Sequence, residues 1–410
     1  MSDFLRDPDL DRIVTELNLG PSDREEAPSR DRDPDAEDSA APRLAPARLS
    51  RVDEGEPLEA YLSEMARRGA SDLLLVPDRP PVFRIDGRLV PAERAALDDS
   101  EIRELFRAFS SERIRQQLET EGSADFSLRL GGGASAGWRF RVNLHRQRGL
   151  LAGAVRALPR SIPTLQSLNL PASLGRLVLP TRGLVLVCGP TGAGKSSTLA
   201  ALLGEVERTR PGHVLTIEDP VEYEHPPGRS IIEQIEVGVD SPSFEAALRA
   251  GLRQDPDVVL VGEMRDLPTV ATALTAAETG HLILSTLHST DVVQAIHRIV
   301  DVFPADQQSQ IRHQLALSLH AIVCQQLLPR ADGFGRVPAV EVMMATYPVR
   351  HHIRSQALQK LYTEITLGKA HGMISFEESL AALVKSGTVT LDEARVRSSR
   401  PDELASLLRA

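Results

Sequence analysis

The sequence predicts an α/β fold, in which a mostly parallel sheet over residues 164–340 follows a small α+β domain over 57–163 and precedes a helical region over 341–410. Three observations support this prediction. From Leu165 onward, short apolar runs alternate with helical patterns, an order typical of parallel sheets. Between residues 57 and 163 most strand-like runs follow one another directly. In the last part an apolar face recurs at helical spacing, formed by Phe376, Leu380, Leu383 and Val384.

Residues 1–56 form an acidic N-terminal extension. Residues 1–50 hold 13 Asp and Glu against 7 Lys and Arg, a net charge of −6. The stretch from Pro21 to Pro46 has few apolar anchors and cannot offset the entropy of ordering, so we expect disorder there. Ahead of it, apolar residues at helical spacing leave open a short docking helix or a frayed tail; they are Leu10, Ile13, Val14 and Leu17.

The elements of the α+β domain are placed from local patterns. Helices are expected at Leu58–Arg67 and Ser100–Glu119, and Asp86-Gly87 is a hairpin turn signal. The expected strands are Asp72–Val76, Val82–Ile85, Ala124–Leu130, Trp138–Leu144 and Ala152–Leu158.

The α/β region is expected to contain four strands and their connecting helices. The strands are Leu184–Cys188, Val214–Glu218, Val258–Gly262 and His281–Ser285. The helices are Ser196–Val206, Phe244–Gln254, Leu267–Glu278 and Val292–Val300. A last element covers Gln308–Leu328.

Composition excludes several classes of protein. With 47 Lys and Arg against 57 Asp and Glu, the net charge is −10, the wrong sign for a protein that mainly neutralises nucleic-acid phosphates. The two cysteines, Cys188 and Cys324, provide neither a disulfide framework nor a zinc module. No apolar run reaches the length of a membrane span, and the acidic N-terminus does not resemble a signal peptide, so we expect a cytoplasmic protein.

The segment Gly189-Pro190-Thr191-Gly192-Ala193-Gly194-Lys195-Ser196 matches the phosphate-binding pattern G-x-x-x-x-G-K-[ST], and it lies between a buried strand and a helix, as the chemistry requires. Its backbone N–H groups would converge on the β-phosphate of a nucleotide, Lys195 would reach the β and γ oxygens, and the Ser196 hydroxyl would bind Mg²⁺. We therefore expect ATP and Mg²⁺ as cofactors, bound by residues 189–196 together with Ser197.

Hydrolysis also needs an acid near Mg²⁺ and a group that handles water. Glu263 ends the apolar strand 258–262 and takes the Walker B place, as a ligand of Mg²⁺ directly or through water. The cluster Glu218, Asp219 and Glu222 would supply the base, although charged strand ends are also common on surfaces. His281 and His288 bracket the next strand; each is catalytic or structural, and no partner at a suitable spacing makes them zinc ligands.

Several segments in order resemble the secretion-ATPase superfamily, and within it the type IV pilus retraction ATPases of the PilT type. The resemblance runs from about residue 57 to about 395. It is carried by the phosphate loop and by Leu-Thr-Ile-Glu-Asp-Pro-Val-Glu at 215–222, Asp-Pro-Asp-Val-Val-Leu-Val-Gly-Glu-Met-Arg-Asp at 255–266, Ala-Leu-Thr-Ala-Ala-Glu-Thr-Gly-His at 273–281, Ser-Thr-Leu-His at 285–288 and Phe-Arg-Val-Asn at 140–143.

The resemblance implies a cytoplasmic ring hexamer, docked at the inner-membrane base of a pilus through a platform protein, with a PAS-like N-terminal domain and a RecA-like ATPase core. It matches Lys195 and Ser196 to the Walker A motif, Glu222 to the catalytic glutamate and Glu263 to the Walker B glutamate. His281 and His288 match the His box. Arg141 and Arg156 match arginines that reach a nucleotide, whereas on pattern alone they, like Arg139, would be a solvated strand face.

The sequence departs from the pattern of retraction ATPases at several places: residues 1–50 have no counterpart, Leu73-Leu74-Leu75 stands where the family commonly has a His in the middle, residues 131–137 suggest a longer hairpin turn, and a C-terminal motif differs. Residues 348–355 read Pro-Val-Arg-His-His-Ile-Arg-Ser, where the family has an Ala-Ile-Arg-Asn-Leu-Ile-Arg-Glu-like motif. The leading function is a Mg²⁺-dependent ATP hydrolase that drives pilus retraction and twitching motility. The alternatives are a pilus assembly or type II secretion ATPase, an auxiliary PilT-like paralogue and, disfavoured by charge, a nucleic-acid translocase.

Overall fold

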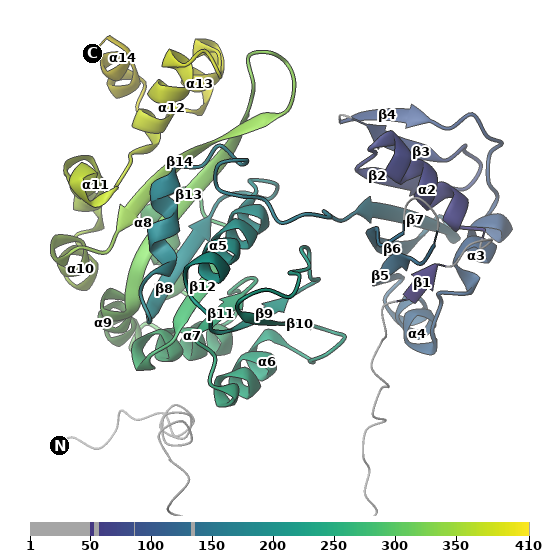
Figure 1. Ribbon diagram of the computed structural model, residues 1–410, viewed down its shortest axis with the longest axis horizontal. Helices are drawn as coiled ribbons and strands as arrows, with labels where there is room; N and C mark the ends of the chain where they lie inside the picture. Colours follow the sequence, from purple (N-terminus) through teal and green to yellow (C-terminus); the bar gives the residue numbers. More distant parts are fainter. Residues whose placement is uncertain (1–49, 53–56, 86, 133–135, 410) are drawn as a thin grey trace, which may run out of the picture. The chain divides into compact units, whose positions relative to one another are not determined.

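A computed structural model of the chain describes residues 50–52, 57–85, 87–132 and 136–409 (Figure 1). The extension expected over residues 1–56 lies outside the described residues, apart from strand β1 (Ser50–Val52), and so does the segment with Leu10, Ile13, Val14 and Leu17. In the described part of the chain, no helix is long and apolar enough to cross a membrane.

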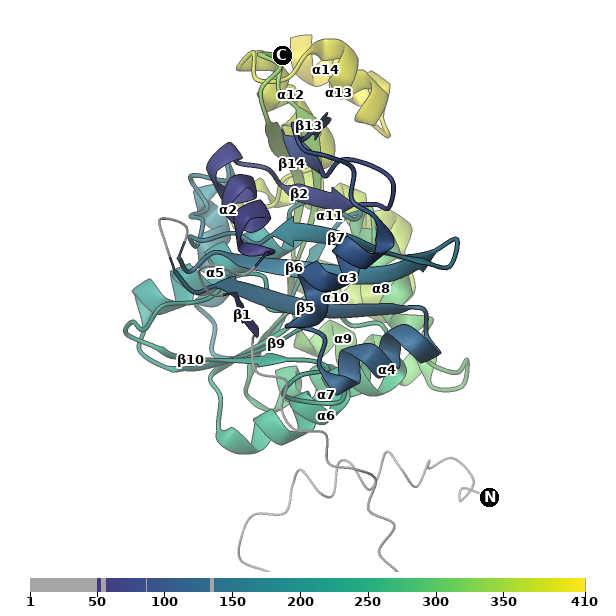
Figure 2. The same cartoon turned by 90° about the vertical axis from the view of Figure 1, so that its right-hand side faces the viewer.

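The N-terminal domain is a seven-stranded sheet in the order β1-β5-β6-β7-β2-β3-β4, antiparallel except for the β1–β5 pair. Helices α2 and α3 lie across one face of it (Figure 2), where their apolar residues pack with Phe83 and Phe140. The strands after β1 are β2 (Asp72–Leu75), β3 (Val82–Ile85), β4 (Arg88–Pro91), β5 (Ser123–Leu130), β6 (Arg139–Gln147) and β7 (Leu150–Ala157). The helices are α2 (Glu59–Arg68), α3 (Asp99–Arg107) and α4 (Glu112–Thr120).

The helix predicted over Ser100–Glu119 is two helices. Asp98 caps α3 through a capping box with Glu101, and Ser111 begins α4 by accepting a hydrogen bond from the Ile114 N–H. Serine favours such N-cap positions because its side chain satisfies a free backbone donor. Helix α3 therefore ends at Arg107 and Ser111 starts the next helix, a break that a single apolar periodicity does not reveal.

The α/β domain is built on a second seven-stranded sheet, in the order β10-β9-β11-β12-β8-β13-β14, with only the β13–β14 pair antiparallel. Its strands are β8 (Gly183–Cys188), β9 (His213–Glu218), β10 (Ile231–Glu236), β11 (Val258–Val261), β12 (Leu282–Leu287), β13 (Leu319–Pro329) and β14 (Arg336–Met344). Its helices are α5 (Lys195–Thr209), α6 (Phe244–Gly251), α7 (Leu267–Thr279), α8 (Val292–Val300) and α9 (Gln308–Ser318).

Helices cover both faces of this second sheet, as parallel sheets require. Helix α5 packs on one face against Val185, Val187 and Leu260. Helices α6 to α9 pack on the other, against strand residues that include Leu186 and Ile217. The sequence prediction missed β10, β13 and β14, and the element predicted over Gln308–Leu328 divides at Ser318 into α9 and β13. Strands β13 and β14 are mostly buried and so have no alternating pattern to distinguish them from a helix, whereas β10 is a partly exposed edge strand.

The C-terminal region is helical, as predicted. It consists of α10 (Tyr347–Arg354), α11 (Leu361–Leu367), α12 (Phe376–Lys385), α13 (Leu391–Arg397) and α14 (Pro401–Arg409), drawn in yellow and green in Figure 1. Leu380 of α12 is buried against Leu328 and Val337 of β13 and β14, and Phe376, Leu383 and Val384 pack around this cluster. The predicted apolar face of this helix is therefore the one that meets the sheet.

Candidate active site

The phosphate loop follows β8 and leads into α5, with the backbone conformation that its glycines allow. Gly189, Gly192 and Gly194 all have positive φ, at +151°, +77° and +88°. A Cβ atom on Gly189 would lie 2.4 Å from the backbone oxygen of Gln325, so only glycine fits there. The loop can therefore turn its N–H groups toward an anion at the N-terminus of α5.

Lys195 is buried at the first turn of α5, and its Nζ donates to the carbonyl oxygens of Gly189 at 3.0 Å and Pro190 at 3.1 Å. Burial lowers the pKa of the Lys195 ammonium, while the charges of Glu263 and Glu222 act in the opposite direction. The Lys195 ammonium is thus held at the phosphate loop, where it is within the electrostatic influence of Glu222 and Glu263.

The Gln325 side chain of β13 connects the phosphate loop to the first turn of α5 by two hydrogen bonds. Its Nε2 donates to the Ala193 carbonyl at 2.6 Å, and its Oε1 accepts from the Thr198 hydroxyl at 2.9 Å. The side chain is buried, so these bonds have no competition from water. Sequence analysis missed Gln325 because it lies in a strand that was not predicted; a polar residue inside an apolar run was the available signal.

Glu263 lies just past the end of β11 and faces His288, which follows β12. The His288 Nε2 is 3.3 Å from Glu263 Oε2, and Arg265 donates to the same oxygen at 2.7 Å. Burial raises the pKa of the Glu263 carboxyl, but Arg265 and His288 outweigh it, so the pKa lies below its ordinary value. An ionised carboxylate at this edge suits a Walker B role.

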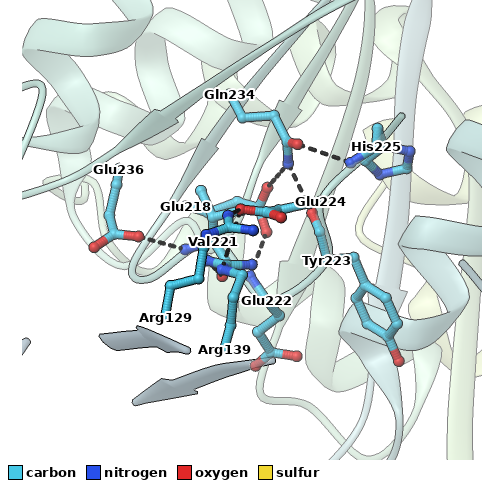
Figure 3. Close-up of polar contacts among 10 residues, drawn as sticks. All are labelled: Arg129, Arg139, Glu218, Val221, Glu222, Tyr223, Glu224, His225, Gln234 and Glu236. Atoms are coloured by element: carbon cyan, nitrogen blue, oxygen red, sulfur yellow. Dashed lines mark hydrogen bonds and ion pairs between the residues drawn. The ribbon is translucent and has the colours of Figure 1, made fainter. Parts of the chain in front are cut away.

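Glu222 belongs to residues 219–225, called here the glutamate loop, which follows β9. Its N–H donates to Glu218 at 3.4 Å, and Figure 3 shows its carboxylate directed away from Glu218 and Gln234. Glu218 is turned inward instead: it accepts from Thr216 at 2.8 Å, and burial raises the pKa of its carboxyl. Of these two acids, Glu222 is therefore the one whose carboxylate is turned away from the sheet edge.

The glutamate loop is also tied to the phosphate-loop helix. The hydroxyl groups of Ser197 and Tyr223 lie 2.7 Å apart, and the Gln234 amide donates to the Tyr223 carbonyl at 2.8 Å. Ser197 was predicted to bind nucleotide; within this chain its side chain connects α5 to the loop that carries Glu222.

Three other predicted residues lie away from the phosphate loop in this chain. His281 precedes β12, at the opposite end of that strand from His288, and its Nδ1 is 3.2 Å from the Ala276 carbonyl oxygen. Arg141 and Arg156 are paired across β6 and β7, and they contact Asp125 at 3.5 Å and Asp72 at 2.8 Å. The structure thus brings Lys195, Glu222, Glu263 and His288 together and leaves His281, Arg141 and Arg156 outside.

The donor set fits Mg²⁺ only in the presence of nucleotide. Ser196 and Glu263 offer hard oxygen ligands, which Mg²⁺ prefers. No group of three or more His, Cys, Asp or Glu side chains among the described residues is arranged to hold a metal by itself. Phosphate oxygens and water would therefore complete the shell of a magnesium ion there.

Comparison with known families shows which protein family this chain belongs to. A family described as "Type II/IV secretion system protein" matches residues 157–395, more than half of the chain. The chain is a member of this secretion ATPase family. The matched range begins at the end of the N-terminal domain and includes the phosphate loop, Glu222 and Glu263.

Within this family the resemblance to PilT is confirmed. The chain is 41% identical over 343 residues to the type IV pilus retraction ATPase PilT of Pseudomonas aeruginosa, covering 83% of this chain and 98% of that protein. It is 37% identical to the type IV pilus ATPase PilU of the same organism, covering 86% and 91%. A crystal structure of the pilus retraction motor PilT with bound ADP has 42% identity and a TM-score of 0.77, covering 86% of this chain and 99% of that one. The protein is thus a PilT-like ATP hydrolase.

Proposed function

We propose that this ATPase is a Mg²⁺-dependent hexameric motor that powers type IV pilus retraction. The observation that carries the proposal is the 41% identity to PilT over nearly the full length of that protein. The geometry of the phosphate loop, with Lys195, Glu222 and Glu263 around it, supports a hydrolase that turns over. A site that only held nucleotide would not need the second glutamate.

Each residue has a proposed role. Residues 189–197 hold the nucleotide, and Lys195 neutralises the β and γ oxygens. Ser196 and Glu263 hold Mg²⁺, which when bound neutralises charge that develops on the phosphates. Glu222 orients a water molecule and accepts its proton at the carboxylate, which is directed away from Glu218 and Gln234 (Figure 3). His288 keeps Glu263 in place through their 3.3 Å contact.

Assembly of the subunits into a ring would explain why Arg141 and Arg156 lie outside the site of their own chain. A closed ring joins two different faces, so one subunit can contribute residues to the site of the next. We propose that Arg141 and Arg156, on the helix-free face of the N-terminal sheet, reach the nucleotide of a neighbouring subunit, and that His281 acts from the opposite edge of the sheet. The proposed setting is the cytoplasmic side of the inner membrane at the pilus base, on a platform protein, without nucleic acid or zinc.

A second candidate is an auxiliary role beside another retraction ATPase. The altered motif at residues 348–355 favours it, because this segment departs from the pattern of retraction ATPases. In the structure, Arg350 of this segment donates to the Leu317 carbonyl at 2.6 Å. The two candidates share the same chemistry and differ in whether the motor acts alone.

Gene deletion tests the proposal in the source organism. Deletion should leave long, surface-retained pili and abolish twitching motility, and a plasmid copy should restore both. Restoration by Lys195→Ala would contradict an ATP-driven motor. Normal motility in the deletion strain, with loss only when a second retraction ATPase is weakened, would favour the auxiliary role. Loss of pili from the surface would instead identify an assembly ATPase.

A further inference from the structure

Arg139, the first residue of β6 in the N-terminal domain, contacts the glutamate loop of its own chain (Figure 3). Its Nη2 donates to the Val221 carbonyl at 2.7 Å, and its Nε lies 3.2 Å from a Glu224 carboxylate oxygen. Arg129, its partner in the β5–β6 register, also pairs with Glu224. The two arginines therefore hold the backbone just before Glu222 and the side chain just after it.

The other contacts of the loop come from the α/β domain. Glu236 accepts from the Val221 N–H at 3.1 Å, Glu218 accepts from the Glu222 N–H, and Gln234 holds the Tyr223 carbonyl and the His225 N–H. These residues lie on β9 and β10, at the same sheet edge as the loop. Among the described residues, Arg129 and Arg139 are the side chains of the N-terminal domain whose contacts with this loop are seen.

Arg139 differs from the other arginines on its sheet face in its burial. Its exposed fraction is 5%, whereas the Arg156 side chain is 70% exposed. Burying a guanidinium is costly unless it is paired and hydrogen-bonded. Glu224, Glu236 and Glu218 supply the opposite charge that offsets part of this cost. Arg139 is thus kept in place by the acids of the loop and the sheet edge.

The strand makes Arg139 a stiff support. Phe140 beside it is fully buried in the core under α2 and α3, and β6 is hydrogen-bonded to β5 and β7 along its length. The planar guanidinium can donate to the Val221 carbonyl and face Glu224 together, which a lysine ammonium on a flexible stem cannot reproduce with the same geometry. A shift of the N-terminal domain by about 1 Å would move the loop or break these bonds.

We propose that Arg139 is a positioning residue for Glu222, and that it links the N-terminal domain of each subunit to catalysis in the same subunit. The inference rests on the proposed role of Glu222 in hydrolysis. In this proposal Arg139 does not touch the nucleotide. It fixes the position of the loop backbone from which the Glu222 carboxylate extends. Withdrawal of the N-terminal domain removes this support and slows hydrolysis without emptying the site.

Substitution of Arg139 in the full-length protein tests the proposal. Arg139→Gln should lower kcat for ATP about 10- to 100-fold, since small misplacements of a catalytic group have effects of that size, while KM and ADP affinity stay within about threefold. Arg139→Lys keeps the positive charge but lacks the planar guanidinium, so its kcat should lie between those of Arg139→Gln and wild type. Arg115→Ala is the control, because Arg115 is an exposed arginine of the same domain, paired with Glu112 at 2.9 Å; it should match wild type.

The decisive measurement combines Arg139→Gln with Glu222→Gln. If Arg139 acts through Glu222, the double variant should have the kcat of Glu222→Gln alone. A further 10-fold loss in the double variant would overturn the proposal, and so would wild-type kcat in Arg139→Gln. Weakened ADP binding with unchanged kcat would also overturn it and make Arg139 a nucleotide contact. If the Arg139→Gln protein has a lower melting temperature than wild type, Arg139→Lys replaces it in the comparison with Glu222→Gln. Wild-type kcat in Glu222→Gln alone would instead refute the proposed role of Glu222.

Discussion

His288 and Glu263 meet at the edge of the sheet, with the imidazole Nε2 3.3 Å from the carboxylate. The two residues follow β12 and β11, neighbouring parallel strands whose carboxyl ends share one edge. The contact pairs the carboxylate proposed to hold Mg²⁺ with an imidazole side chain. Burial raises the pKa of the Glu263 carboxyl, but the hydrogen bond from Arg265 and then this contact with His288 bring it below its ordinary value.

Lys195→Ala should reduce ATP turnover at least about 100-fold, since loss of one preorganised donor to developing charge has effects of this order. The Nζ is held at the phosphate loop by the carbonyls of Gly189 and Pro190. A coupled phosphate-release assay on the purified variant measures the loss. Wild-type turnover in a folded Lys195→Ala protein would refute the phosphate-loop assignment.

The two glutamates should differ in what their amide variants lose. Glu222→Gln should lower kcat about 10²- to 10⁴-fold with nucleotide affinity retained, because a general base is removed and no ligand is lost. Glu263→Gln should instead require more Mg²⁺ for half-maximal activity, because a charged ligand is lost. Titration of kcat against Mg²⁺ separates them. A higher Mg²⁺ requirement in Glu222→Gln with unchanged kcat would place Glu222 at the metal.

Much of this site could be predicted because its chemistry is written in short local motifs. The phosphate loop needs glycines, a lysine and a hydroxyl at fixed spacing, and Glu263 and His288 each follow an apolar strand. Their meeting then follows from the parallel order of β11 and β12. Glu222 was located by resemblance to a family, since the pattern alone left three acids open.

The residues that hold the site in place could not be predicted in this way. Gln325 contacts Ala193 of the phosphate loop although the two residues are 132 positions apart in the chain. It lies on a strand that has no alternating pattern. Arg139 has the same sequence signature as Arg141, two positions along the same strand face, but only Arg139 is buried against the glutamate loop. Such contacts depend on tertiary packing, and the local sequence does not specify them.

Gln325→Leu should destabilise the phosphate loop. The substitution keeps the volume but leaves the Ala193 carbonyl without its buried partner, a loss of about 1–3 kcal/mol, while the Thr198 hydroxyl keeps only its bond to the Gly194 carbonyl. We expect a lower melting temperature and weaker ADP binding. Thermal unfolding with and without ADP measures both. Gln326→Leu, at the next position on β13, is the control, and an equal effect from it would show that the Gln325 contacts are unimportant.

Mixed rings test whether arginines act between subunits. If Arg141 and Arg156 complete the site of a neighbour, a subunit with Arg156→Ala still has an intact phosphate loop, and a Lys195→Ala subunit still has its arginines. Mixing the two inactive proteins should therefore restore part of the activity, with a maximum near equal amounts. Activity that never exceeds the sum of the two separate proteins would place the arginines in the site of their own chain.

The last prediction concerns Glu341, a buried residue of β14 that accepts a hydrogen bond from the Val292 N–H at 3.1 Å. Burial raises the pKa of its carboxyl from 4.5 to about 7. Below pH 4.5 both the folded and the unfolded chain hold the proton, so the group has no effect on relative stability. As pH rises toward 7 the unfolded chain releases its proton first, and the folded state loses stability until its own pKa is passed.

Glu341→Gln should remove this dependence, because the amide oxygen can still accept from Val292 and carries no proton that titrates. The variant should match wild type near pH 4 and be more stable near pH 8, by a margin on the order of 3 kcal/mol as the shift in pKa implies. Denaturant unfolding at the two pH values measures the margin, with the exposed Glu112→Gln as control. Equal stability of variant and wild type at pH 8 would show that the Glu341 carboxylate ionises in the folded protein without cost, and would exclude burial as the cause of the raised pKa.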